Sequence, residues 1–261
     1  MPEHFAALSF YGLLASLLLA ERLRPHAWRA QAATRWLTNG ALFLLAGLTA
    51  GALLPGGLAS LTATLRPANT GVFVAEVAAI VLARDLLGYW QHRLLHGVPL
   101  FWRAHRVHHS DRQVDVTTGV RHHPLETALS LGIAAAFVAG VGMSVASLGV
   151  ALGLARLAAV YQHTSLDLPA SLDRRLRRLL VTPSVHRLHH SRRQPQTDSN
   201  FGTVFTLWDR LFGTYRDPAA APLEALGLDA FDGEAEETLV AALTQPFRSP
   251  AAGPVPERSP A

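Results

Sequence analysis

The sequence predicts an all-α integral membrane protein, a bundle of about four to five transmembrane helices with a cytosolic helical cap that carries a di-metal site. Three observations predict this fold class. Hydrophobic residues make up 49% of the 261 residues and charged residues only 16%, which is outside the usual range of soluble domains. The mean hydropathy is positive, at +0.20. Long apolar segments recur along the chain, and eleven of its 13 histidines cluster beside them.

Two apolar segments within residues 1–70 predict N-terminal transmembrane helices. Phe5 to Ala20 is almost entirely apolar, and the residues before it lack the positive charge of a signal peptide, so we expect a retained span. Leu37 to Leu54 predicts the second span. This span ends at Pro55-Gly56-Gly57, a sequence that breaks helices.

A third helix and a further apolar segment follow. Val72 to Ala83 opens a helix that continues toward His92. Between Glu126 and Arg156 there is no charged residue, and at ~1.5 Å per helical residue this length exceeds one span but falls short of two. It fits either a helical hairpin that turns between Gly140 and Ser147 or one long tilted span.

The arginines predict the orientation of the bundle. All 23 basic residues are arginine, and only Arg66 lies between the second and third spans. The arginines between the first two spans, and those after the third helix and the apolar segment, share one side if the hairpin returns the chain. Because positively charged loops face the cytoplasm, we expect the cytoplasmic membrane of a bacterium, with the metal site on its cytoplasmic side.

Several classes of site and partner are excluded by composition. The chain has no cysteine, which rules out iron–sulfur clusters, thiolate zinc sites and disulfides within it. It has no CxxCH haem motif and no GxGxxG after a strand-like segment, so no electron-transfer domain is evident. The isoelectric point is about 10.3, but the arginines lie between apolar segments and form no nucleic-acid-binding face.

Residues 218–261 predict a C-terminal tail that is partly disordered. Its composition is rich in alanine, proline and acidic residues. Glu236 to Phe247 predicts a short helix with Leu239 and Leu243 facing inward. Arg248 to Ala261 predicts a disordered end.

The histidine clusters have the spacing of metal ligands. On a helix, residues three and four apart share one face, with Cβ atoms ~5–6 Å apart, so HxxxH and HxxHH each direct their imidazoles to one point. His4 and His26 stand apart, and we assign them, with His122, to ordinary interfacial or hydrogen-bonded roles. The nine candidate metal ligands are His92, His96, His105, His108, His109, His163, His186, His189 and His190.

This number of imidazoles is enough for two metal ions. Neutral imidazole binds zinc, copper, iron and nickel, and a structural zinc site needs about four ligands. Two metals held by imidazole without thiolate, beside a bilayer, are consistent with two iron ions that keep positions open for O2.

Polar residues at helical offsets predict support for the ligands. Asp85 and Tyr89 lie on the same helical stripe as His92 and His96. Asp85 is expected either to accept the second N–H of a ligand histidine or to pair with Arg84.

A second polar group precedes the long apolar segment. It consists of Arg121, His123 and Glu126. An acidic residue beside a span is costly in lipid, so we expect Glu126 to have a polar partner, either Arg121 or a histidine. The candidate supporting residues are therefore Asp85, Tyr89, His123 and Glu126, and no catalytic residue separate from the metal ligands is predicted.

The ordered set of motifs resembles the fatty acid hydroxylase/sterol desaturase superfamily of integral-membrane di-iron oxidases. The motifs, in chain order, are DLLGYWQHRLLH, FWRAHRVHHS, RHHPLE, TPSVHRLHHS and DSNFGTVFTLWDRLFGTY. They extend from Asp85 to Tyr215, half of the chain, and an ordered set of histidine boxes is far more specific than one HxxHH.

The resemblance implies a transmembrane bundle under a cytosolic cap, with residues 71–217 as the catalytic domain. His163 is similar to the family's isolated ligand on the returning helix, and His123 sits in its HPxE-like element, as ligand or as support. The three boxes of the resemblance contain, in order, His92 and His96; His105, His108 and His109; and His186, His189 and His190. Ser165 and Phe201 replace an asparagine and a tyrosine common in the family, which leaves the pocket shape and the substrate open.

The resemblance implies an enzyme that uses O2 and two iron ions to oxidise a C–H bond of a fatty acyl, sterol-like or other isoprenoid lipid. We expect hydroxylation, with desaturation at the same site as the alternative. Electrons are expected from a separate ferredoxin or cytochrome-type donor, because this chain has no haem or iron–sulfur motif. A histidine-rich membrane protein for metal binding or transport, and a catalytically silent relative, are the competing hypotheses.

The lipid is expected to enter sideways from the membrane. Five aromatic side chains are candidates for lining this entrance, with an aromatic belt at the interface as the alternative. They are Phe101, Trp102, Phe205, Trp208 and Phe212.

Overall fold

The computed structural model of the chain describes residues 2–23, 32–55, 71–141, 144–221 and 225–249. Within these ranges the protein is all-helical apart from two isolated β-bridges, Leu180 with Phe205 and Ser191 with Leu226. The helices are α1 (Pro2–Arg22), α2 (Ala32–Leu53), α3 (Phe73–Gly97), α4 (Pro99–His109), α5 (Pro124–Val141), α6 (Val145–Gln162), α7 (Ala170–Leu176), α8 (Pro183–His189), α9 (Leu207–Leu211) and α10 (Leu239–Thr244). The predicted all-α class is therefore correct.

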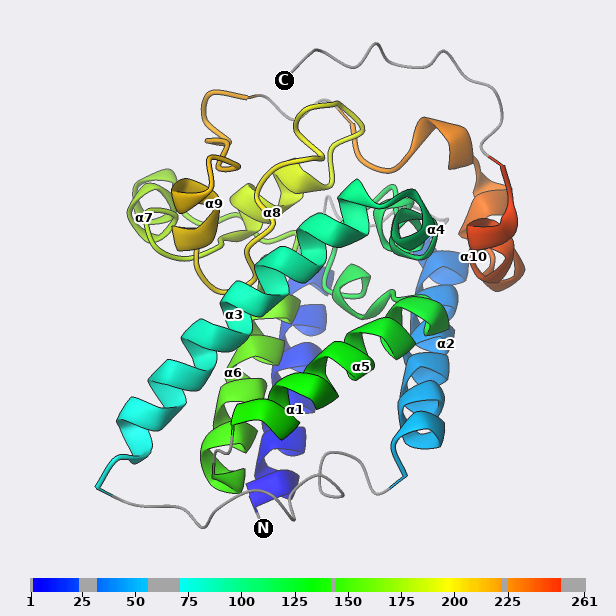
Figure 1. The fold of residues 1–261 in the computed structure, drawn as a ribbon. Helices are drawn as coiled ribbons and strands as arrows, with labels where there is room; N and C mark the ends of the chain where they lie inside the picture. Colours follow the sequence, from blue (N-terminus) through cyan, green and yellow to red (C-terminus); the bar gives the residue numbers. More distant parts are fainter. Residues whose placement is uncertain (1, 24–31, 56–70, 142–143, 222–224, 250–261) are drawn as a thin grey trace.

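The long helices form the lower part of the molecule and the short helices lie above them (Figure 1). In that view α1, α2, α5 and α6 lie below α4, α7, α8 and α9, and α3 runs obliquely from the lower part up to α4. Helix α6 packs against both α1 and α3, while α2 packs against α5. This arrangement brings the ends of several long helices to the base of the short-helix layer.

Two helices are long and apolar enough to cross a bilayer, Ala33–Leu53 in α2 and Val145–Gln162 in α6. Helix α5 is apolar over the shorter stretch Pro124–Gly140. Helix α1 covers the segment expected as the first span. The predicted number of four to five spans stays a prediction.

Helix α3 begins where the third span was expected, but it differs from α2 and α6 in charge. It carries Glu76, Arg84 and Asp85 among its apolar residues. Glu76 accepts hydrogen bonds from the Ser144 backbone N–H at 3.1 Å and from the Ser147 hydroxyl at 2.7 Å, and Asp85 is buried. The charged residues of α3 are thus satisfied in part by neighbouring protein, as polar groups away from water require.

The long apolar segment forms two helices rather than one tilted span. Helix α5 ends at Val141 and α6 begins at Val145, with Ser144 accepting a hydrogen bond from the Ser147 N–H as the N-cap of α6. Glu126 at the start of α5 accepts a hydrogen bond from His105 of α4, and His163 directly after α6 lies 3.1 Å from His108 of α4, measured between the two Nε2 atoms. The hairpin therefore returns the chain to the layer it left.

The C-terminal segment packs onto this layer. Leu239 and Leu243 of α10 pack against a buried cluster of Leu42, Val107 and Ala242. The two leucines thus face inward, as predicted. Arg106 of α4 donates hydrogen bonds to backbone carbonyls of this segment. Residues 250–261, expected to be a disordered end, lie outside the described residues.

Candidate metal centre

All nine candidate ligands come together in the structure, in two groups. The first group is His92, His96, His105, His109 and His189, and the second is His108, His163, His186 and His190. In each group, one potential ligand atom per residue lies within 4.8 Å of all the others. The side chains of His4 and His26 lie outside the described residues.

Two short helices present six of these histidines. Helices α4 and α8 each have proline in the first turn, where its fixed φ favours helix initiation and its missing N–H costs no hydrogen bond. Both helices end within or just before their HxxHH motif. The i, i+3, i+4 spacing then puts three imidazoles of each helix on one buried face.

Most ligand histidines are fixed by a hydrogen bond from Nδ1. Four of these bonds go to backbone carbonyls, which can only accept. The donors are His92 to Phe201 O (2.9 Å), His108 to Arg121 O (3.3 Å), His163 to Ala159 O (2.6 Å) and His189 to Ser199 O (2.7 Å). The proton therefore sits on Nδ1 and leaves Nε2 with a bare lone pair.

Bare Nε2 atoms face one another. His108 Nε2 lies 3.1 Å from His163 Nε2, and both rings have already placed their proton on Nδ1. Likewise, His92 Nε2 lies 3.1 Å from His105 Nε2. Two lone pairs at this distance repel unless a cation lies between them, so these contacts are not ordinary hydrogen bonds.

The donor set fits transition-metal ions. An imidazole nitrogen lies about 2.0–2.1 Å from a bound metal, so neighbouring ligands at right angles are ~3 Å apart, the spacing of these contacts. His189 Nε2 is buried and has no hydrogen-bond partner among the described residues. Imidazole without thiolate suits iron, zinc and copper alike. The residues present therefore fit the two metals that their number predicts.

The protonation state of the short-helix histidines also favours metal binding. Burial, and then the neighbouring imidazoles, lower the pKa of each of these histidines well below its ordinary value. The group consists of His108, His109, His186, His189 and His190. At neutral pH these rings are uncharged, which is the form that binds metal.

Glu126 is a supporting residue, as predicted from its position. Its Oε1 accepts hydrogen bonds from His105 Nδ1 at 3.0 Å and from His122 Nδ1 at 3.1 Å. The side chain is buried. His122 stacks on His108, with ring centroids 4.9 Å apart, but belongs to neither histidine group. The Glu126 carboxylate therefore fixes the tautomer of the candidate ligand His105. It also holds His122, which is not a candidate ligand, beside the candidate ligand His108.

Asp85 and Tyr89 do not contact the ligand histidines as expected. Asp85 accepts hydrogen bonds from the N–H groups of Val204 and Phe205, at 2.9 and 3.0 Å, and from Trp208 Nε1. It lies seven residues before His92, about 10 Å along the helix, and so cannot reach that ring. The Tyr89 hydroxyl pairs with Thr214. Both residues instead hydrogen-bond to the segment that follows α8, which includes α9.

His123 also differs from its expected role. Its Nδ1 accepts a hydrogen bond from the Leu125 N–H, and its Nε2 donates to the Leu243 carbonyl. It belongs to neither histidine group among the described residues. The ring points to the C-terminal segment because adjacent residues at the start of a helix face different directions. Of the four predicted supporting residues, only Glu126 hydrogen-bonds to a candidate ligand among the described residues.

The loop 198–209 supplies three ligand supports that sequence reasoning missed. Asp198 accepts a hydrogen bond from His96 Nδ1 at 3.1 Å, and the carbonyls of Ser199 and Phe201 accept from His189 and His92. Only Asp198 had a sequence signal, as an acidic residue in the DSNFG motif. A carbonyl occurs at every residue, so its role depends on the fold.

Asp209 and Gly202 shape this loop. Asp209 accepts hydrogen bonds from the N–H groups of Phe201 and Gly202, each at 2.8 Å. A Cβ added to Gly202 would lie 2.4 Å from the Phe205 carbonyl oxygen. Only glycine therefore fits at this position.

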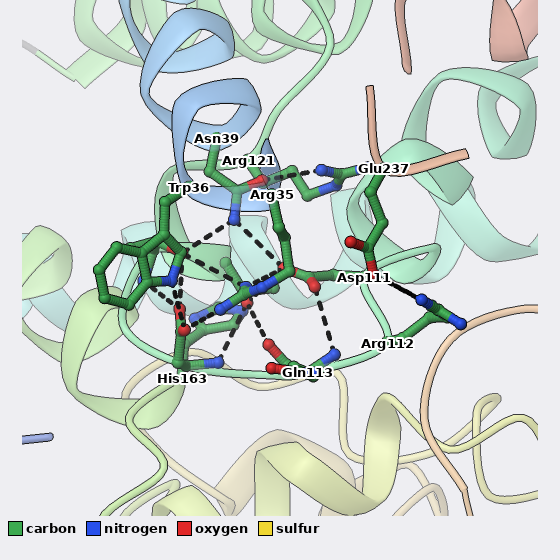
Figure 2. Close-up of polar contacts among 12 residues, drawn as sticks. Arg35, Trp36, Asn39, Asp111, Arg112, Gln113, Arg121, His163 and Glu237 are labelled. Carbon is green, nitrogen blue, oxygen red and sulfur yellow. Dashed lines mark hydrogen bonds and ion pairs between the residues drawn. The ribbon is translucent and has the colours of Figure 1, made fainter. Parts of the chain in front are cut away.

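A buried polar network attaches α2 to the metal centre (Figure 2). Arg35 donates to Asp111 at 2.9 Å, and Arg121 Nη1 donates to Asn39 Oδ1 at 2.7 Å. The Arg121 carbonyl is the acceptor for His108. An N-terminal helix is thus connected through Arg121 to a candidate ligand.

The two positions that depart from the family's common residues have clear contacts. The Ser165 N–H and the Thr164 hydroxyl donate to Glu21 of α1, at 2.6 and 2.8 Å. The Phe201 ring packs edge-on against His92, with centroids 5.5 Å apart. Neither departure removes a candidate ligand from its group.

A cavity of about 290 Å³ lies against the histidines, between α3, α5 and α6. Its lining includes candidate ligands of both groups and several polar side chains, among them Arg84, Gln91, Ser130 and Gln162. The five aromatic residues expected at an entrance do not line it. Phe205 instead joins the apolar core, Trp208 bonds to Asp85, and Trp102 packs against His96. That these residues line a lipid entrance stays a prediction.

Comparisons with known proteins agree with this site. The fatty acid hydroxylase family profile matches residues 77–214, which include every candidate ligand. An alkylglycerol monooxygenase from Xenopus tropicalis is 33% identical over 134 residues, which are 51% of this chain and 29% of that protein. An ornithine lipid hydroxylase from Rhizobium tropici is 30% identical over 177 residues, 66% of this chain and 50% of that protein.

A very-long-chain aldehyde decarbonylase from Oryza sativa is 30% identical over 169 residues, 61% of this chain and 54% of that protein. The chain therefore spans about half or less of the length of these relatives. No solved structure matches. Since the family profile covers more than half of the chain, and the histidine groups lie within it, the chain belongs to the fatty acid hydroxylase family.

Proposed function

We propose that this protein is a membrane-bound, O2-dependent di-iron oxidase that hydroxylates a C–H bond of a lipid. The observation that carries the proposal is the 3.1 Å approach of two unprotonated ring nitrogens, His108 Nε2 and His163 Nε2. A metal cation between them would relieve the repulsion of the two lone pairs. Family membership and relatives named for hydroxylation or monooxygenation of lipids support oxidation as the use of this cation.

Each part of the site has a role in this proposal. The two histidine groups would hold one iron ion each, and the bound irons would activate O2, the oxidant that breaks the C–H bond. Glu126 and Asp198 orient ligand rings through Nδ1. The cavity holds the substrate carbon beside the histidines and excludes bulk water.

Hydroxylation consumes one O2, two electrons and two protons, and yields the alcohol and one water. The electrons come from a separate ferredoxin or cytochrome-type donor, because the chain has no cysteine and no haem motif. Removal of a second hydrogen atom would give a double bond instead. We favour hydroxylation because the relatives include a lipid hydroxylase.

The substrate enters from a membrane. Helices α2 and α6 are the candidate spans, and the arginine distribution favours the cytoplasmic side of a bacterial inner membrane for the histidines. The alternative, a metal transporter, would have ionisable ligands along a path through the spans. The nine histidines lie instead in or directly after α4 and α8 and near the C-terminal ends of α3 and α6.

The first test is the metal content of the detergent-purified protein. Iron and zinc are counted together, because zinc can replace iron during expression. We expect close to two metals per chain. The protein is then supplied with reduced ferredoxin, membrane lipids and 18O2, and the product is expected to gain one labelled oxygen atom. Two bound metals without any oxidised lipid would favour a metal-binding or silent relative.

A matched pair of histidine variants tests the ligand assignment. His189→Ala removes a buried ring of the first group and is expected to abolish turnover and lower the metal content. His123→Ala, in the same protein layer but outside both groups, is expected to keep both. Full turnover in His189→Ala would refute the site.

A further inference from the structure

Arg84 is a charged residue of the cavity that metal binding does not use. It lies on α3, two helical turns before His92, and lines the cavity. A Cβ added to Gly88 would lie 3.1 Å from Arg84 Nη1. The guanidinium therefore lies over Gly88, about 6 Å along the helix axis from His92. The missing side chain at Gly88 provides the room that it occupies.

Arg84 forms no ion pair among the described residues, and the charges of Asp85 and Arg156 act on it at longer range. The two oxygens of Asp85 accept hydrogen bonds from Val204, Phe205 and Trp208. Arg84 Nε is buried and has no hydrogen-bond partner among the described residues. A buried guanidinium nitrogen without a partner is costly, and a ligand that accepts its hydrogen bond would restore the missing contact.

The cavity also offers an acceptor. Gln162, at the end of α6, is buried, and its Oε1 has no hydrogen-bond partner among the described residues. Gln91 and Ser130, by contrast, bond to each other at 2.6 Å. An acyl chain in this cavity would leave Arg84 and Gln162 desolvated and unsatisfied, at a cost for each group. A ligand with both an anionic group and a hydrogen-bond donor would satisfy both.

We propose that Arg84 and Gln162 bind the polar head of the lipid substrate, with its anionic group on Arg84 and a hydroxyl or ammonium donor on Gln162. This inference rests on the proposed function and adds the substrate class, a lipid with an anionic head group. Because the guanidinium lies about one helical turn below His92, the carbon that is oxidised lies within a few bonds of the head group. A volume of about 290 Å³ suits a head group with its adjoining carbons, while the remaining chain lies among the helices.

The test compares ligands that differ only in charge. Dodecyl phosphate and dodecanol have the same chain, so both partition similarly into a non-ionic detergent micelle. Their affinities for the detergent-purified, full-length protein are measured by calorimetric titration without an electron donor, so that no turnover occurs. We expect dodecyl phosphate to bind about ten times more tightly than dodecanol, as a charge-assisted contact with arginine requires.

Three variants locate the effect. Arg84→Gln is expected to abolish the preference for dodecyl phosphate. Arg175→Gln is the matched control, because it removes the same charge from an exposed position of α7 outside the cavity lining, and it is expected to keep the preference. Gly88→Ala keeps the charge but crowds the guanidinium, and it is expected to weaken the preference. Equal losses in Arg84→Gln and Arg175→Gln would refute a direct contact.

Two further results separate the possible failures. Inorganic phosphate is added as a competitor, and displacement at the concentrations of dodecyl phosphate would indicate a site for free anions and overturn the assignment to a lipid. A sample with two metals per chain but no charge preference would overturn this inference alone. A well-folded sample with less than one metal per chain would overturn the proposed function.

Discussion

At the scale of single residues, most of the nine candidate ligand rings are held by an acceptor for their Nδ1 proton. Six candidate ligands have such an acceptor, and four of the six acceptors are backbone carbonyls. The other two are the carboxylates of Glu126 and Asp198. The carboxylate side chain of Glu126 is 6% exposed and that of Asp198 is 47% exposed, so these residues differ in how strongly water screens them.

Replacement of Glu126 by glutamine is expected to weaken metal binding by about 10- to 100-fold, the usual effect of losing an outer-shell partner. The amide oxygen can accept a hydrogen bond from His105 Nδ1, but the negative charge is lost and the NH2 group opposes the N–H of His122. Competition with a chelator of known affinity measures the change. Asp198→Asn is the control, and its exposed position predicts a smaller effect. Equal affinity in Glu126→Gln and the unmodified protein would contradict this role.

The two histidine groups were predictable from the sequence because residue type and spacing decide which imidazoles share a helix face. HxxxH and HxxHH place imidazoles on one face of any helix. Asp85 shows the limit of this reasoning, since its helical stripe is correct but its partners lie in a loop more than a hundred residues later. A stripe gives the direction of a side chain, whereas the fold decides what lies opposite.

At the scale of elements, the loop 198–209 is as important as the helices. Asn200 adopts a left-handed conformation with φ 55°, and its side chain bonds to backbone groups of Val185 and Arg216. Asp209 accepts hydrogen bonds from the N–H groups of Phe201 and Gly202, the two residues that follow Asn200. These contacts hold the carbonyl of Phe201 under His92. A short motif without metal ligands thus builds one wall of the centre.

Gly202→Ala is expected to disturb this wall. The new Cβ would overlap the Phe205 carbonyl, which overpacking data suggest costs roughly 1–3 kcal/mol. We expect a lower thermal midpoint and a lower metal content per folded chain. Gly132→Ala in α5 serves as the control, because a Cβ there has no neighbour within 4 Å. The same metal content and midpoint in both variants would contradict a structural role for Gly202.

The elements themselves were partly predictable. The apolar lengths predicted α2, and the two helices α5 and α6 resolve the alternative between a hairpin and a tilted span. The polar cavity was not predictable, because its lining comes from α3, α5 and α6 and no single segment has a marked pattern. Aromatic residues were a poor guide to the lining of the cavity, because the same residue types also pack in the core and against other rings.

At the scale of the whole molecule, the metal centre joins elements that are far apart in sequence. Its candidate ligands come from α3, α4 and α8 and from the ends of α6 and α8. The buried network of Arg35, Asn39 and Arg121 extends this connection to α2. Ligand binding to the folded state alone adds to its stability. Metal binding should therefore stabilise the short-helix layer more than the isolated long helices.

Removal of the metals is expected to loosen this layer. Without cations, the facing lone pairs of His108 and His163 repel, and the rings must turn or protonate. Hydrogen exchange of the chelator-treated protein in detergent is expected to increase in α4 and α8 and to change little in α2. Restoring the metal gives the control. Unchanged exchange in α4 and α8 would contradict a stabilising role for the metals.

The carbonyl acceptors have a consequence for mutational tolerance. A carbonyl is kept whichever amino acid is encoded, so Ala159, Ser199 and Phe201 can change their side chains and still orient His163, His189 and His92, provided the backbone is preserved. Ala159, which also lines the cavity, is then a position where a library of variants can alter selectivity without dismantling the centre. Directed evolution of the enzyme toward new substrates can begin at such positions.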